Sequence, residues 1–135
     1  RKDRVMPYVD RAIEYLRAEQ PESTEVNVLW GDSTPSNVMF ADDGSVNALI
    51  DWELAALGPS ELDLAWWLYF DDLFSRRFGV ERLEGLPSRE ETIRIWETEV
   101  GRSAQHLEYY DVVVALRMAL VAVGAFDRQV GIGNI

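Results

Sequence analysis

Residues 29–53 constrain the fold of this chain more than any other stretch. Two short apolar runs, 38–40 and 46–50, flank a turn that contains Asp43-Gly44. An Asp-Gly turn between apolar runs is a strong local signal for a β-hairpin. The stretch therefore predicts two antiparallel strands, with polar side chains gathered where the hairpin opens.

Three polar residues lie at this open end. Asp32 is in the loop before the first strand, Asn37 directly precedes that strand, and Asp51 directly follows the second. With the turn centred on Gly44, Asn37 is predicted to lie opposite Asp51, and directly opposed side chains have Cβ atoms roughly 4.5–5.5 Å apart. A carboxylate beside an amide oxygen suits Mg²⁺, which takes few protein ligands and shares the rest with phosphate and water. An acid in the adjoining loop can orient a hydroxyl group and accept its proton.

Beyond the hairpin, the chain is predicted to be almost entirely helical. The expected elements are a helix over 7–19, a short strand near 26–29, a helix that starts at Ser60, another from Ser88 to Gly101, and a long one after Ser103. Ser88 and Glu91 form a capping box, and Ser60 and Asp63 form an approximate one. The most apolar segment, 112–126, is too short to span a bilayer comfortably, so it is interpreted as a buried helix. The expected fold class is α+β, mostly α, with a small β-hairpin.

Composition excludes several classes of function. The chain has 13 basic and 24 acidic residues, a net charge of −11, and no cysteine. Such an acidic chain repels nucleic acid and anionic membrane surfaces, so neither is expected as a partner. Without cysteine there is no disulfide, thiolate metal site or cysteine nucleophile. The charged start of the sequence shows no signal peptide, and we expect one cytoplasmic domain or one part of a larger one.

Two segments carry a recognisable signature, Gly31-Asp32-Ser33-Thr34-Pro35-Ser36-Asn37 and Ile50-Asp51-Trp52-Glu53. They resemble the aminoglycoside phosphotransferase and choline kinase-like family, and the Asp63-Leu64-Ala65 segment matches the same pattern. The resemblance is specific from about Val28 to Trp67. Trp30 stands where the family usually has His, and a large aromatic ring there can support the loop by packing. This Trp-Gly-Asp form resembles a bacterial branch akin to the kinase domains associated with acyl-CoA dehydrogenases.

The resemblance implies a role for each residue of the signature. Asp32 is expected to be the catalytic base, and Asn37 and Asp51 to be the Mg²⁺ ligands that hold the phosphates of ATP. Asp63 is expected to accept hydrogen bonds from the backbone of the catalytic loop. Glu53 is less firmly implied, either as a support for the metal site or as a ligand of a second metal. The alternative for Glu53 is an exposed acid after a strand.

The implied activity is ATP-dependent phosphoryl transfer to the hydroxyl group of a small molecule. The implied fold is protein-kinase-like, with residues 1–135 forming its C-terminal lobe and the hairpin carrying the catalytic and metal-binding loops. No glycine-rich loop precedes Asp32, and Lys2 is the only lysine. The N-terminal nucleotide-binding lobe of such kinases is therefore expected to be absent, and the chain to be inactive alone.

The expected partners are the hydroxyl substrate and the absent N-terminal lobe or, alternatively, a second copy of the chain. Aminoglycosides, choline-like amines, sugars and hydroxyacyl compounds all remain open as substrates. Two other functions also remain open. One is a non-catalytic binding or regulatory module that keeps this lobe as a scaffold. The other is a hydrolase that uses Asp32 and Asp51 as a carboxylate pair.

Overall fold

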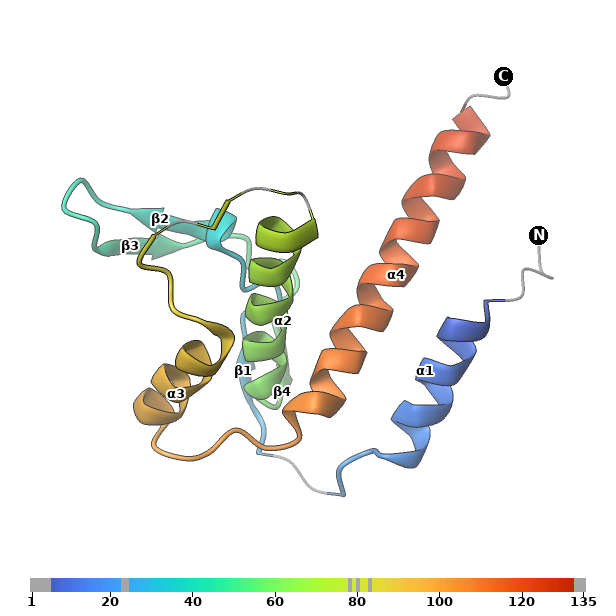
Figure 1. Cartoon of the computed structure of the whole chain (residues 1–135), viewed down its shortest axis with the longest axis horizontal. Helices are drawn as coiled ribbons and strands as arrows, with labels where there is room; N and C mark the ends of the chain where they lie inside the picture. Colours follow the sequence, from blue (N-terminus) through green and yellow to red (C-terminus); the bar gives the residue numbers. More distant parts are fainter. Residues whose placement is uncertain (1–5, 23–24, 78, 80, 83, 133–135) are drawn as a thin grey trace.

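A computed structural model describes residues 6–22, 25–77, 79, 81–82 and 84–132. Its elements are α1 (Pro7–Ala18), β1 (Asn27–Leu29), β2 (Val38–Phe40), β3 (Val46–Leu49), β4 (Ala56–Gly58), α2 (Glu61–Asp72), α3 (Arg89–Val100) and α4 (Leu107–Ile132). A 3-10 turn covers Pro35–Asn37, and a π-helical turn covers Leu73–Arg77. Figure 1 shows α2 between α3 and α4, with the β2–β3 hairpin extending from one end of it. The expected class, α+β and mostly α, is confirmed.

A small core joins α2 to α4. Ala65 and Trp66 of α2 meet Tyr110 and Val114 of α4, and all four side chains are buried. The ring of Trp66 also packs on Phe70, with centroids 5.3 Å apart. Burial of large apolar and aromatic side chains is the main favourable term in folding, so this core determines where α2 lies. The first half of α2 then faces the loop that carries Asp32.

Over residues 107–125, the helix α4 is buried on one face only. Tyr110 and Val114 face the core, whereas Leu120 and Val121 are 50% and 53% exposed. The prediction of a buried helix over 112–126 is therefore wrong, because among the described side chains of this segment only Val114 is buried. Across the described residues, the structure has no helix with the length and apolar character that a membrane crossing needs.

The predicted hairpin forms, but with a different register. The pairs are Val38 with Leu49, Met39 with Ala48, and Phe40 with Val46. The Ala41 N–H donates to the Ser45 carbonyl, and the Gly44 N–H donates back to the Ala41 carbonyl. Gly44 has φ +84, the left-handed region that glycine reaches without strain. The turn is thus centred one residue earlier than predicted, and a bulge at Asn47 recovers only part of the difference.

This register changes which residues meet at the open end. The Ile50 N–H donates to the Asn37 carbonyl at 3.0 Å, so Asn37 faces Ile50 and not Asp51. The predicted pairing of Asn37 with Asp51 is wrong by one residue. Asp51 still follows directly, and it has φ 62, in the left-handed region.

A second two-stranded sheet pairs β1 with β4, which the sequence analysis did not predict. The strands are antiparallel, with Val28 opposite Leu57. Gly58 lies against Leu29 so closely that a Cβ atom there would be 2.9 Å from the Leu29 Cδ1 atom. Because β1 precedes the signature segment and β4 follows it, their pairing closes residues 30–55 into one unit.

Only one of the predicted N-terminal helix caps is present as expected, and the predicted end at Gly101 is present too. At α3, Ser88 and Glu91 make a reciprocal capping box, and Gly101 ends the helix with φ 78. Ser60 does not cap α2, because its backbone is already helical, with φ −61 and ψ −21, and its side chain accepts no hydrogen bond from the helix. Its hydroxyl instead accepts from the Asn27 side chain at 3.1 Å. The expected box of Ser60 with Asp63 is therefore wrong.

The start of α4 also differs from the prediction. Ser103 does not cap it, and the helix begins at Leu107. The N–H groups of Ala104 and Gln105 donate instead to the carboxylates of Glu97 and Glu61, at 2.9 and 3.0 Å. These side-chain acceptors hold the connection to α3 in a non-helical path for several residues.

The buried carboxylate of Glu61 predicts acid sensitivity. Burial raises the pKa of Glu61, but hydrogen bonds from Arg102 and the Gln105 backbone outweigh burial and place it below the usual 4.5. A carboxylate with a lowered pKa in the folded state stabilises the fold above its unfolded pKa, and this contribution is lost as pH falls through the folded value. We expect Glu61→Gln to lower the free energy of unfolding at neutral pH by about 2 kcal/mol. The free energy of unfolding of the variant should also fall less than that of the parent chain when the pH is lowered.

Urea unfolding followed by tryptophan fluorescence, at neutral pH and at about pH 4, measures both effects. The exposed Glu99 on α3 gives the control Glu99→Gln, which should match the parent chain. Equal acid dependence in the parent and Glu61→Gln chains would contradict the prediction.

Candidate active site

The loop after β1 is shaped by Gly31. This residue has φ +84, and a Cβ atom there would lie 2.1 Å from the Leu54 carbonyl oxygen. Only glycine fits such an approach of two backbone segments. The loop then turns back on itself, because the Thr34 N–H donates to the Asp32 carbonyl at 2.8 Å and the Asn37 N–H donates to the Thr34 carbonyl at 3.0 Å.

Asp63, in the first turn of α2, ties this loop to the helix. Its carboxylate accepts the backbone N–H groups of Trp30 and Gly31, at 2.7 and 2.9 Å. The Ser33 hydroxyl donates to the Asp63 carbonyl at 2.7 Å. Three hydrogen bonds therefore join residues 30–33 to one residue of α2, and they hold the loop backbone on both sides of Asp32.

Asp63→Ala is expected to lower the free energy of unfolding by about 3 kcal/mol, because two backbone donors lose their charged acceptor. Urea unfolding measures the change. The control is Asp42→Ala, in the exposed hairpin turn, which should change stability by no more than about 0.5 kcal/mol. Similar losses in the two variants would show that Asp63 does not hold the loop.

The carboxylate of Asp32 is held from two directions. Asn37 donates from Nδ2 to Oδ2 at 2.9 Å, and Trp66 donates from its indole Nε1 to Oδ1 at 2.9 Å. Asn37 Nδ2 also lies 3.1 Å from the Asp32 carbonyl. A carboxylate has about four lone-pair positions, so each oxygen of Asp32 keeps room for a further donor such as a hydroxyl group.

Sequence analysis did not find Trp66. Its place in an apolar helical segment predicts a core residue, and it is indeed buried. The contact with Asp32 joins positions 34 residues apart, so no local pattern could reveal it. The sequence contains one indirect indication that Trp66 lies near the site, because Trp66 directly follows the Asp63-Leu64-Ala65 segment of the signature.

The two residues expected to bind metal lie near each other but share no hydrogen bond. The amide nitrogen of Asn37 is used on Asp32, and no described residue donates to its Oδ1 atom. Asp51 is exposed, and its carboxylate likewise accepts no hydrogen bond from any described residue. Its φ of 62 is tolerated by Asp better than by most residues. An amide oxygen and a carboxylate, both uncommitted, form a donor set that fits Mg²⁺.

Two tryptophans connect the loop to the hairpin. The Trp30 indole donates to the Ile50 carbonyl at 2.8 Å, and the Trp52 indole donates to the Leu49 carbonyl at 2.8 Å. The two rings lie 6.0 Å apart. Trp30 is buried and joins the end of β1 to the end of β3, so it supports the loop both by packing and by a hydrogen bond.

The structure does not bring Glu53 into contact with the other predicted site residues. Its side chain is exposed, and no hydrogen bond among the described residues links it to Asp32, Asn37 or Asp51. Nor do any three carboxylate or histidine side chains in the described part of the chain come together as metal ligands. Nothing in the geometry favours a second metal over the simpler interpretation of Glu53 as an exposed acid.

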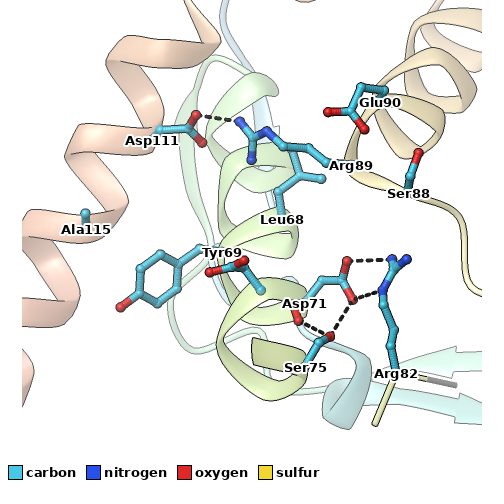
Figure 2. Close-up of a pocket in the computed structure, with 11 residues that line it drawn as sticks. Leu68, Tyr69, Asp71, Ser75, Arg82, Ser88, Arg89, Glu90, Asp111 and Ala115 are labelled. Carbon is cyan, nitrogen blue, oxygen red and sulfur yellow. Dashed lines mark hydrogen bonds and ion pairs between the residues drawn. The ribbon is translucent and has the colours of Figure 1, made fainter. Parts of the chain in front are cut away.

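A separate pocket of about 530 Å³ involves α2, α4 and the start of α3 (Figure 2). Two of its acids are in ion pairs: Arg82 contacts Asp71 at 2.8 Å, and Arg89 contacts Asp111. Burial raises the pKa of Asp111, whereas Arg89 acts in the opposite direction. No described residue of the 31–37 loop lines this pocket, so it is distinct from the group around Asp32.

Comparison with known proteins identifies the family. The family model for the phosphotransferase enzyme family matches residues 2–96. The chain belongs to this family. The resemblance stated from the signature residues is confirmed, and the matched range contains the whole group from Trp30 to Asp63.

Individual proteins are also similar to this chain. The chain is 27% identical over 139 residues to acyl-CoA dehydrogenase family member 11 of Pongo abelii and 27% identical over 134 residues to family member 10 of Mus musculus. Among solved structures, a Ralstonia eutropha protein assigned as an aminoglycoside phosphotransferase matches with a TM-score of 0.82 and 22% identity. That match confirms the expected kinase-like fold.

The chain is much shorter than these relatives. The matches cover 96%, 92% and 96% of this chain but only 18% of family member 11, 12% of family member 10 and 42% of the Ralstonia protein. The comparison therefore establishes the family to which this chain belongs. It does not establish the activity of the complete protein.

Proposed function

We propose that this chain supplies the catalytic loop of an ATP-dependent phosphotransferase that acts on a small-molecule hydroxyl group. The observation that carries the proposal is the carboxylate of Asp32, held between Asn37 and Trp66 with lone pairs still available. Asp51 lies just beyond, at the end of β3. Membership of the phosphotransferase family supports the type of reaction. The geometry supports different roles for the two acids, with Asp32 as the base and Asp51 as a metal ligand.

In the proposed reaction, Asp32 accepts a hydrogen bond from the substrate hydroxyl and takes its proton as the oxygen attacks the terminal phosphoryl group of ATP. The bond from that group to the β-phosphate breaks, and ADP leaves. Asn37 Oδ1 and the Asp51 carboxylate would hold Mg²⁺. When bound, the ion neutralises charge on the transferred group. Asp63 and Trp30 keep the loop backbone in place while Asp32 acts.

We also propose that residues 1–135 form the C-terminal lobe of the enzyme and act with a nucleotide-binding lobe. The supporting observation is a pair of exposed apolar side chains on each of the two sheets that flank the signature loop in the sequence. Val28 and Leu57, opposite each other in the β1–β4 sheet, are 72% and 75% exposed, and Phe40 and Val46 of the hairpin are both 59% exposed. Neighbouring exposed apolar side chains of this size mark interaction surfaces. The nucleotide lobe is the preferred occupant, and a second copy of the chain is the alternative.

The role of Asp51 is tested by Asp51→Asn in the protein that joins this chain to a nucleotide-binding lobe. Asn tolerates a φ of 62 as well as Asp does, so the backbone is preserved while a charge is lost. We expect the Mg²⁺-dependent part of ATP binding to fall at least about tenfold, because removing one anionic ligand weakens a site with few protein ligands.

Calorimetric titration of ATP with and without Mg²⁺ measures this dependence. The matched control is Glu53→Gln, an exposed acid two residues further on, which should leave binding unchanged. If Glu53→Gln removes the Mg²⁺ dependence and Asp51→Asn does not, Glu53 is the Mg²⁺ ligand and Asp51 is not.

The reaction itself is tested by transfer of labelled γ-phosphate from ATP to a panel of acceptors. The panel should contain an aminoglycoside, choline, a sugar and a hydroxyacyl compound, with water as the background acceptor. Transfer to one of them above the rate to water is the expected result. No transfer to any acceptor with the nucleotide-binding lobe present would favour the non-catalytic module, and hydrolysis without ATP would favour the hydrolase.

A further inference from the structure

We infer that Trp66, backed by Arg117, is a positioning residue that orients the carboxylate of Asp32 towards its substrate. The inference rests on the proposed function, because it assigns Asp32 as the base. The contact on which it depends can be tested without any turnover.

Trp66 differs from an ordinary core tryptophan in where its indole N–H points. The ring is buried among Ala65, Tyr110 and Val114, yet the nitrogen donates to Asp32 Oδ1 at 2.9 Å. An indole N–H can donate but cannot accept, so it cannot take a proton from the base or from the substrate. Its direct contribution at Asp32 is therefore a hydrogen bond from a fixed direction, which can orient the carboxylate.

Arg117 connects Trp66 to the same loop from the side of α4. Its guanidinium carbon lies 4.2 Å from the centre of the Trp66 ring, and its Nη1 atom donates to the Gly31 carbonyl at 3.4 Å. A guanidinium over a tryptophan face is attracted by the ring and packs flat against it. Arg117 thus holds the plane of the indole and the residue before Asp32 together. This contact also accounts for a charged residue within the apolar segment 112–126.

The consequence for Asp32 follows from the number and direction of its donors. Asn37 and Trp66 hold different oxygens and come from different elements, so rotation of the carboxylate would break at least one bond. The unused lone pairs then keep a constant direction. Reacting groups that are already oriented avoid part of the cost of reaching the transition state, and small misplacements can reduce rates substantially.

The contact is tested by ¹H–¹⁵N spectra of the labelled 135-residue chain. Trp66→Phe keeps an aromatic ring but removes the indole N–H, and so identifies the Trp66 indole resonance. The matched control is Trp67→Phe, the next residue on α2. In Asp32→Ala, we expect the Trp66 indole resonance to shift and its exchange with solvent to rise at least about tenfold, because its acceptor is gone.

Positioning is read from the side-chain amide of Asn37, which bonds to the other oxygen of Asp32. If Trp66 orients the carboxylate, Trp66→Phe shifts the Asn37 amide resonances and Trp67→Phe leaves them in place. An unchanged Asn37 amide in Trp66→Phe, or an unchanged Trp66 indole in Asp32→Ala, overturns the inference. If Trp66→Phe does not fold, the Trp66 indole is assigned in the parent chain by its through-space contacts, and the Asp32→Ala spectrum still decides whether the contact exists.

Kinetics separate this inference from the proposed function. In the protein that carries both lobes, Trp66→Phe should lower kcat about tenfold or more and leave the KM for ATP within about twofold. Unchanged kcat overturns the positioning role even if Asp32→Asn is inactive. Full activity of Asp32→Asn overturns the proposed function, whatever the spectra show.

Discussion

Replacing Gly31 with alanine is expected to lower the free energy of unfolding by about 3–5 kcal/mol. Two costs combine: an alanine with φ near +84 is strained by about 1–2 kcal/mol, and its Cβ atom would overlap the Leu54 backbone. The overlapping atom is a carbonyl oxygen 2.1 Å away, and it cannot rotate aside as a side chain can. Such a loss is a large fraction of the stability of a small domain.

Gly44→Ala is the matched control. Gly44 has the same φ of +84, but no atom lies within 4 Å of a Cβ placed there. It should therefore show only the cost of the backbone conformation, about 1–2 kcal/mol. Urea unfolding of both variants, followed by tryptophan fluorescence, isolates the contact with Leu54 as their difference. Equal losses at the two positions would mean that the loop and residue 54 do not approach as closely as described.

Asp32→Asn is expected to reduce phosphoryl transfer about 10³-fold or more. Loss of a general base costs typically 10²–10⁴-fold, and the amide also disturbs the hydrogen bonds around it. Asn37 and Trp66 both donate to the carboxylate, whereas an amide has only one oxygen to accept them. ATP binding should be retained, because Asn37 and Asp51 remain.

The measurement is transfer from labelled ATP, together with calorimetric binding of ATP, in the protein that carries both lobes. Asp42→Asn, in the exposed hairpin turn, controls for the loss of one negative charge and should keep full activity. Retention of turnover by Asp32→Asn would exclude Asp32 as the base. Loss of ATP binding along with turnover would instead indicate a structural role for Asp32.

Local patterns predicted those features that depend on neighbouring residues. The capping box of Ser88 and Glu91 forms because both partners lie within one turn of helix. The hairpin forms because an Asp-Gly turn separates two apolar runs. The register failed by one residue, since it depends on whether the turn closes around Gly44 or just before it, and on a bulge further along the strand.

The contacts around the site depend on long-range packing, and the sequence patterns missed most of them. The strand β4 has three residues, too few to show a period, and it forms because β1 lies beside it. By local pattern Asp63 resembles a helix-capping residue. Only the family resemblance led us to expect that its carboxylate accepts the backbone N–H groups of the catalytic loop, as it does at residues 30 and 31. Trp66 and Arg117 resemble a core residue and an interruption in an apolar helix. Their roles emerge only when α2 and α4 pack together.

The sequence by itself determined the chemical types and their order along the chain: an acid in a glycine loop, an amide, a hairpin and a second acid. Residue identity and short spacing are sufficient for that, because they act within a few residues. The tertiary structure alone decided how Asp32 is oriented and why Gly31 must be glycine. Both depend on the Asp32 loop meeting α2, α4 and the backbone of Leu54, and burial of the α2–α4 core determines where those elements lie.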